Sequence, residues 1–238
     1  MTQFSKYSDV IFDAFLLHSK RREIIDRKHE IIDKIVEYYN AGVESILFIG
    51  FNPAILAVKA KEIFVAEVSD SVYDWILSQG VNAIRYTEPR QFDCVVAFDE
   101  YLTFTRTEQE QLQAINSLCK MSKGMIITTV KDYKNQDFKD REYSQPAIIR
   151  ANNCVTAFTE IHDWDIKDKT LWESAVYQLS GMNSDCKGIY NRRTLFFKQL
   201  AKFTADAGAT NFLVHKNLMY KSLIKKNYEH VISIHFEN

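Results

Sequence analysis

The clearest indication of architecture is Ser45-Ile46-Leu47-Phe48-Ile49-Gly50, a continuous apolar run that ends at a glycine. Such a run is typical of a parallel strand that is buried on both faces of a sheet. A helical stretch near residues 54–60 leads to a second run, Glu62-Ile63-Phe64-Val65-Ala66-Glu67, which ends on a carboxylate. The two runs predict neighbouring strands of an α/β protein.

The same alternation continues toward the middle of the chain. Ser69, Asp70 or Ser71 is suited to cap a helix that runs to about Gln79. Three further segments predict a brief third strand, a fourth and a fifth strand, at residues 82–86, 92–98 and 125–130. Before the fifth, Thr105-Arg106-Thr107-Glu108 matches a capping box that opens a helix. We expect a Rossmann-like, mostly parallel central sheet.

Both ends and one internal segment depart from this alternation. Residues 1–43 predict an N-terminal helical extension with one helix from about Ser8 to Asn40, whose apolar side chains recur every three or four positions. Residues 131–190 predict an insertion with a β-hairpin, whose strands cover residues 154–162 and 170–179. After a helix at residues 191–207, the strands at 211–215 and 231–236 are too close in sequence for a crossover, which predicts an antiparallel last strand.

Size and composition are those of one domain, residues 1–238, with 46% hydrophobic residues. Thirty basic residues against thirty-one acidic ones give a net charge of −1, so a nucleic-acid partner is not favoured, although a local patch would still allow one. The four cysteines lack metal-ligand spacing, and we find neither a bilayer-spanning apolar run nor a secretory signal. We expect a cytoplasmic protein with no metal site and no membrane partner.

Over residues 44–238 the order of elements resembles the class I (Rossmann-like) S-adenosylmethionine-dependent methyltransferases. In that family the first strand ends in an acidic residue and a glycine-rich turn that receives the cofactor. Here Gly50 matches the first glycine, but Phe48 stands where the acid would be. Asn52 replaces the second glycine and Ala54 the third, so the glycine-rich motif is degenerate.

The resemblance also implies where S-adenosylmethionine would bind. Glu67 matches the carboxylate at the tip of the second strand, which accepts hydrogen bonds from both ribose hydroxyls. Glu88 lies where the family often places an acid near the adenine, and 17 positions from Gly50 to Glu67 imply a shortened first helix. The implied cofactor-binding residues are Gly50, Asn52, Glu67, Ser69, Glu88 and Phe98.

Three residues are candidates for catalysis. Asp99 and Glu100 follow the fourth strand, where the family lines cofactor and substrate, but they would also suit a solvated loop. His162 in the expected hairpin is a candidate base because histidine titrates near neutral pH, although a lone histidine in a strand is more often structural. Nearby aromatic residues predict either a substrate wall or ordinary packing: Trp164, Trp172 and Tyr177.

Two functions compete on these observations, and enzymatic activity stays open between them. The first is methyl transfer from S-adenosylmethionine to a small-molecule substrate, which requires cofactor affinity. The second is a catalytically inactive methyltransferase-like protein that serves as a structural or protein-interaction module, which requires a protein partner. A dehydrogenase ranks last because no G-x-G-x-x-G follows the first strand.

Overall fold

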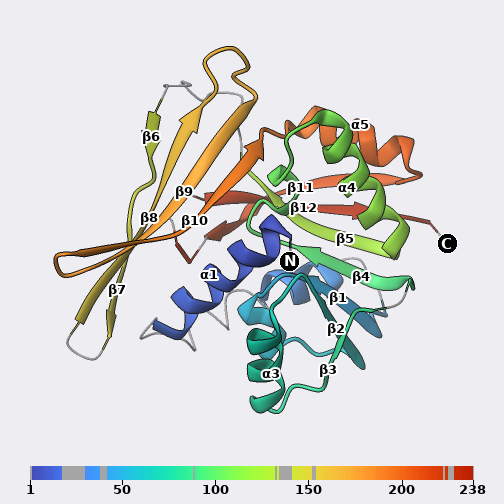
Figure 1. The fold of residues 1–238 in the computed structure, drawn as a ribbon. Helices are drawn as coiled ribbons and strands as arrows, with labels where there is room; N and C mark the ends of the chain where they lie inside the picture. The colour runs from blue at the N-terminus through green and yellow to red at the C-terminus, as the bar shows by residue number, and fades with distance from the viewer. Residues whose placement is uncertain are drawn as a thin grey trace.

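The computed structural model describes residues 2–17, 30–37, 42–87, 89–131, 133, 141–151, 154–221, 223–224 and 228–237. Its central sheet has seven strands in the order β11-β12-β5-β4-β1-β2-β3 (Figure 1). The strands are β1 (Ser45–Ile49), β2 (Glu62–Ala66), β3 (Ala83–Arg85), β4 (Phe92–Ala97), β5 (Ser122–Val130), β11 (Asn211–Lys221) and β12 (Tyr228–His235).

The direction of the strands confirms the predicted sheet. β1 pairs in parallel with β2 on one side and with β4 on the other, and all five of its residues are buried. β12 is antiparallel to both β5 and β11. Burial of β1 on both faces is the reason why its sequence is apolar at every position rather than at alternate ones.

The helices largely follow the sequence signals. They are α1 (Gln3–Leu17), α3 (Asp70–Ser78), α4 (Glu108–Met121) and α5 (Phe197–Asp206), with the 3-10 helices η1 (Pro53–Leu56) and η2 (Tyr101–Thr103). The capping box lies two residues later than expected. The Thr107 hydroxyl accepts from the Glu110 amide and the Glu110 carboxylate accepts from the Thr107 amide. Thr107 and Glu110 satisfy the same spacing as the predicted pair, and η2 occupies the chain just before them.

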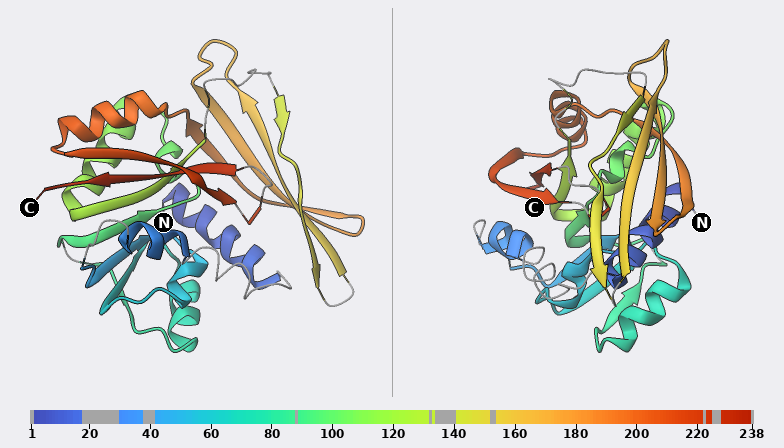
Figure 2. Two further views of the ribbon diagram at one scale, coloured as in Figure 1. Left: turned by 180° about the vertical axis from the view of Figure 1, so that it is seen from behind. Right: turned by 90° about the vertical axis from the view of Figure 1, so that its left-hand side faces the viewer.

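The predicted N-terminal helix is wrong in its bounds. α1 already begins at Gln3 and ends at Leu17, and residues 30–37 are helical again. The rest of the predicted segment, 18–29 and 38–41, lies outside the described residues. α1 is buried along much of its length because it lies between the central sheet and a second sheet (Figures 1 and 2).

The second sheet is larger than the expected hairpin. The predicted pair is confirmed as β8 (Cys154–Trp164) and β9 (Leu171–Ser180), which are antiparallel. They belong to a five-stranded sheet with β6 (Arg141–Tyr143), β7 (Ala147–Ala151) and β10 (Asn183–Arg193), which stands beside the central sheet (Figure 2). β10 pairs with β9 as far as Arg193, so the last helix starts at Phe197 instead of residue 191.

Within the described residues, no helix is both long and apolar enough to cross a bilayer. Within the same part of the chain, no three histidine, cysteine or acidic side chains converge in a way that would hold a metal ion.

The β11–β12 pair should make stability depend on pH. His215 and His235 each place Nε2 within 2.9 Å of the Ser233 hydroxyl, at 2.8 and 2.9 Å. Burial lowers the pKa of both imidazoles from the ordinary 6.5, and for His235 the neighbouring His215 lowers it further. The unfolded chain therefore binds more protons than the folded one below that pH.

We expect the free energy of unfolding to fall as pH decreases through about 6.5, and to fall less steeply in His215→Gln. Urea unfolding between pH 7.5 and 5.5 measures both slopes. Identical slopes in the two proteins would contradict a neutral, partly buried His215.

Candidate functional site

The candidate site lies where three neighbouring strands of the central sheet end. β1 has β2 on one side and β4 on the other, so the chain reverses its direction of progress across the sheet at this point. Open α/β sheets bind ligands in the crevice outside the carboxyl ends of such strands. Gly50, Glu67 and Asp99 follow β1, β2 and β4, so the fold brings these three predicted residues to one edge.

The turn after β1 is built by Gly50 and Asn52. Gly50 has a φ of +80°, and its N–H donates to the Ala66 carbonyl at 2.8 Å. Asn52 is extended, with a φ of −138°, and its Oδ1 accepts from the Ala54 N–H at 2.9 Å to cap η1. The first crossover helix is therefore a single four-residue 3-10 helix, which agrees with the short spacing between Gly50 and Glu67.

The space above this turn is filled by α1. A Cβ atom at Gly50 would lie 2.6 Å from Phe4 Cε1, so the Phe4 ring packs directly on the glycine backbone. The Phe51 N–H donates to Ser8 Oγ at 2.6 Å. The Phe4 ring also lies 4.7 Å from the ring of Tyr101, edge to face. In this conformation the chain covers its own glycine turn.

Glu67 adopts a left-handed conformation, with a φ of 56°, at the tip of β2. Such a conformation is costly for a residue with a side chain, and residues of this kind are concentrated at functional sites. The carboxylate accepts a hydrogen bond from the Thr2 hydroxyl. It lines a cavity of about 470 Å³ that also contacts Phe4, Tyr101 and Phe104. Burial, and then the charge of Glu67, raises the pKa of Tyr101 to about 12.

Asp99 and Glu100 are buried, at 3% and 1% exposure, and not in a solvated loop. Both are left-handed, with φ values of 57° and 55°. Asp99 Oδ2 accepts from the Tyr220 hydroxyl at 2.6 Å, while Asp99 Oδ1 has no hydrogen-bond partner among the described residues. Burial, and then the Asp99 carboxylate, raises the pKa of Tyr220.

Glu100 is held by partners from two other segments. Its Oε1 accepts from the Tyr133 hydroxyl at 2.7 Å, and its Oε2 accepts from Arg192 Nη2 at 3.2 Å. The Arg192 guanidinium is itself buried and lies 3.8 Å from the centre of the Phe104 ring. Burial lowers the pKa of Arg192, but the carboxylates of Glu100 and Glu160 outweigh it, so the pKa is raised. Glu100 therefore neutralises a buried cation.

The remaining predicted residues lie elsewhere. His162 is buried in β8, with Nε2 3.4 Å from Glu160 Oε1 and its ring 4.4 Å from that of Trp172. Ser69 caps α3 by accepting from the Val72 N–H, and the buried Phe98 packs its ring on Tyr220. Glu88 lies outside the described residues.

Several residues at the crevice were not expected from the sequence. Phe104 and Arg106 line the cavity beside Glu67, next to Tyr101 of the run that follows the fourth strand. Arg192 reaches Glu100 from a strand 92 positions away. The only available signal was the aromatic and acidic run after the fourth strand, which does not reveal partners so distant in sequence.

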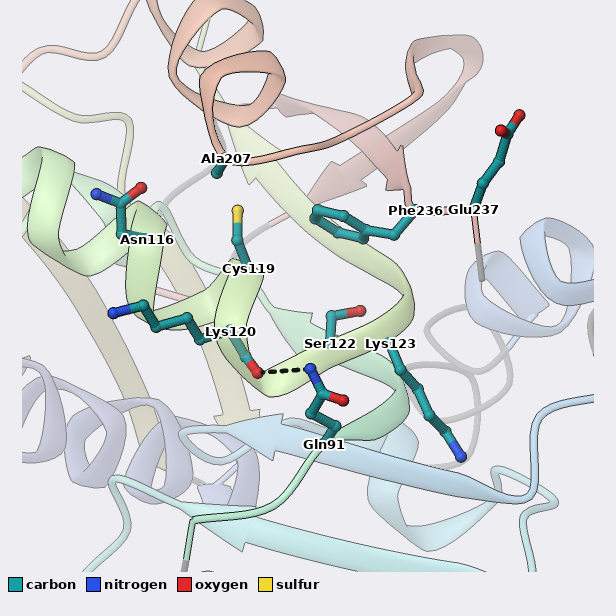
Figure 3. Close-up of a pocket in the computed structure, with 9 residues that line it drawn as sticks. All are labelled: Gln91, Asn116, Cys119, Lys120, Ser122, Lys123, Ala207, Phe236 and Glu237. Carbon is teal, nitrogen blue, oxygen red and sulfur yellow. Dashed lines mark hydrogen bonds between the residues drawn. The ribbon is translucent and has the colours of Figure 1, made fainter.

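A larger cavity, of about 560 Å³, lies at the opposite edge of the sheet. It is bounded by the segments at the start of β4 and β5, where Gln91 Nε2 donates to the Lys120 carbonyl at 3.3 Å (Figure 3). Burial raises the pKa of the adjoining Cys119 thiol to about 11, so it is protonated and unreactive at neutral pH. We place the candidate site at the carboxyl ends of the strands instead.

No model of a known protein family matches the sequence, and no curated protein matches it. Solved structures do match. DesVI of Streptomyces venezuelae aligns over 97% of this chain and 98% of its own, with a TM-score of 0.69 and 12% identity.

Two further matches are methyltransferases by name. The sugar N-methyltransferase KedS8 from a Streptoalloteichus species covers 91% of this chain and 90% of its own, with a TM-score of 0.65 and 9% identity. CalS10 of Micromonospora echinaspora, an amino pentose methyltransferase solved with S-adenosylmethionine bound, covers 87% and 89%, with a TM-score of 0.62 and 9% identity. The chain therefore has the class I S-adenosylmethionine-dependent methyltransferase fold.

Proposed function

We propose that this protein is an S-adenosylmethionine-dependent methyltransferase that acts on a small-molecule acceptor. The observation that carries the proposal is the Glu67 carboxylate, which projects from the tip of β2 into a cavity at the point where the strand order reverses. Similarity to KedS8 and CalS10 supports the cofactor and a small acceptor. In this proposal residues 1–238 form one domain and residues 131–190 are its insertion.

The crevice fits the cofactor unequally along its length. The two carboxylate oxygens of Glu67 suit the two hydroxyls of a ribose. The Thr2 hydroxyl already donates to one of these oxygens, as a ribose hydroxyl would. Above Gly50 the Phe4 ring leaves no room even for a Cβ atom, so the first turn of α1 must move before a ligand contacts this turn.

The chain's own groups would contribute positioning more than acid–base chemistry. S-adenosylmethionine supplies an electrophilic methyl group, and catalysis then depends mainly on holding the acceptor in line with it. Asp99 Oδ1 is the group we assign to accept a proton or hydrogen bond from the acceptor, because it is buried and has no partner within the described part of the chain. Asp99 does not line the cavity beside Glu67, so this role requires a neighbouring side chain to move when the acceptor binds.

Glu100 already accepts hydrogen bonds from Arg192 and Tyr133. His162 lies in β8 of the second sheet. We therefore assign no catalytic role to either residue.

A specific observation favours the second function, a catalytically inactive module. Three residues of the chain itself contact the parts of the crevice that a cofactor would use. The Thr2 hydroxyl donates to the Glu67 carboxylate, the Phe4 ring packs on Gly50, and Ser8 Oγ accepts from the Phe51 N–H. Together with Phe48 in place of the usual acid, these contacts describe a crevice that is closed by the protein's own N-terminus.

Calorimetric titration with S-adenosylmethionine and S-adenosylhomocysteine separates the two functions. We expect saturable binding by the wild-type protein and binding weakened by about tenfold to a hundredfold in Glu67→Ala, because hydrogen bonds to a charged acceptor are lost. Glu62→Ala is the matched control. Glu62 lies at the other end of β2 and pairs with Arg90 at the surface.

Each alternative result has a meaning. If neither S-adenosylmethionine nor S-adenosylhomocysteine binds at millimolar concentration, the methyltransferase proposal is wrong and the inactive module is favoured. Binding that is equally strong in Glu67→Ala and in the wild type would remove Glu67 from the site.

A further inference from the structure

A second cavity, of about 420 Å³, opens on the second sheet beside the crevice. Trp164 ends β8, Trp172 lies near the start of β9 and Arg192 lies near the end of β10, so three neighbouring strands contribute to its lining. Arg106, from the loop before α4, lines both this cavity and the one beside Glu67. The two cavities are therefore adjacent.

Buried hydrogen-bond donors of this cavity lack acceptors among the described residues. Arg192 is 1% exposed and Trp172 is 4% exposed. Arg192 Nε and Nη1 and Trp172 Nε1 have no hydrogen-bond partner among the residues that the structure describes. Leaving such donors unsatisfied is costly, and groups of this kind in native proteins usually have a partner. Three such donors, on two residues that line one cavity, indicate a ligand with acceptor oxygens.

The acceptors of the cavity are, in contrast, already engaged. Asp163 receives Arg141 Nε and Nη2 on its two oxygens, at 2.5 and 2.9 Å. Asp165 Oδ1 accepts from the backbone amides of Lys167 and Asp168, at 2.7 and 2.8 Å. Glu173 is exposed, so water screens its charge. The unfilled hydrogen-bonding capacity of the cavity is thus mainly that of donors.

Charge points the same way. The Arg192 cation is balanced by the nearby carboxylates of Glu100 and Glu160. Arg106 acts on the charge of Glu110 but forms no ion pair with it or with any other residue of the described part of the chain. An entering anion would bring a charge that Arg106 can balance at the mouth. The planar fork of a guanidinium beside an indole N–H suits two oxygens of one carboxylate or phosphate.

We infer that this cavity binds the carboxylate or phosphate group of a small molecule, with Arg192 and Trp172 donating to its oxygens and Arg106 balancing its charge. The inference goes beyond the proposed methyl transfer and holds for an inactive module as well. If methyl transfer occurs, the adjacent crevice makes this oxyanion a handle by which an acceptor is held.

The three tryptophans of the chain provide a direct readout. The ¹⁵N-labelled protein would be titrated with sodium phosphate and, separately, with sodium acetate, at an ionic strength held constant with sodium chloride. We expect the Trp172 indole N–H signal to shift in a saturable manner, while that of Trp75 on α3 stays in place. Whichever anion saturates at the lower concentration identifies the group as phosphate or carboxylate.

Two variants test the assignment of the donors. Trp172→Phe keeps an aromatic ring but removes the N–H, and tryptophan fluorescence of Trp164 should then report binding weakened about tenfold or more. Arg106→Ala changes an exposed residue, so it decides the question if Trp172→Phe proves unstable. It should weaken anion binding severalfold.

Three results would overturn the inference. One is a Trp172 signal that stays in place up to the highest anion concentration. A second is a shift of all three indole signals in proportion to added salt, and a third is unchanged affinity in folded variants. None of these depends on S-adenosylmethionine, so they are distinguishable from failure of the methyltransferase proposal.

Discussion

Arg192→Met is expected to lower the free energy of unfolding by about 3–5 kcal/mol, because it leaves the Glu100 carboxylate buried without its cation. Both side chains are almost inaccessible, at 0% and 1% exposure. Urea unfolding followed by circular dichroism measures the change. Arg193→Met is the matched control, since Arg193 is the next residue of β10 and its pair with Asp168 is longer, at 3.7 Å, and partly exposed. We expect about 1 kcal/mol or less from the control.

A double-mutant cycle with Glu100→Gln tests the reason for this loss. Removing both charges leaves no uncompensated ion in the core, so the double variant should be more stable than the sum of the single changes predicts. If Arg192→Met costs no more than Arg193→Met, the pair is solvated in solution and the core between the two sheets is looser than the structure shows.

Gly50→Ala is expected to cost about 2–5 kcal/mol. Part of the loss, about 1–2 kcal/mol, comes from placing a Cβ atom on a residue with a φ of +80°. The rest comes from the contact of that Cβ with the Phe4 ring, since overpacking a core typically costs about 1–3 kcal/mol. Thermal and urea unfolding measure the sum.

Gly80→Ala isolates the two parts. Gly80 has the same φ of +80°, but no atom lies within 4 Å of the position its Cβ would take, so only the backbone cost applies. The difference between the variants measures the contact between α1 and the glycine turn. Equal losses would mean that Phe4 is not on the turn in solution, which would favour an open crevice and methyl transfer over the inactive module.

Much of the central sheet could be predicted because its signals are local. β1, β2, β4 and β5 each contain an apolar run whose burial follows from its own composition, and the short link from β11 to β12 permits an antiparallel arrangement alone. The short spacing between Gly50 and Glu67 likewise predicted a reduced first helix, found as η1.

The predictions were less accurate where distant segments decide the outcome. Asn191 to Arg193 would suit a helix start by local pattern, but pairing with β9 keeps them in a strand. Asp99 and Glu100 would suit a solvated loop by local pattern. Both are buried instead, because Tyr220 donates a hydrogen bond to Asp99 and Arg192 donates one to Glu100. Polar groups enter a core only when partners satisfy them, and those partners are far away in the sequence.

The sequence by itself determined the class of fold, the mostly parallel direction of the strands and the position of Gly50 and Glu67 at the carboxyl ends of β1 and β2. Only the tertiary structure decided that α1 lies on the glycine turn, that Arg192 joins the second sheet to Glu100, and that a donor-lined cavity lies beside the crevice. The physical reason is that periodic burial is encoded residue by residue, whereas the pairing of a buried charge depends on which distant segment supplies the opposite one.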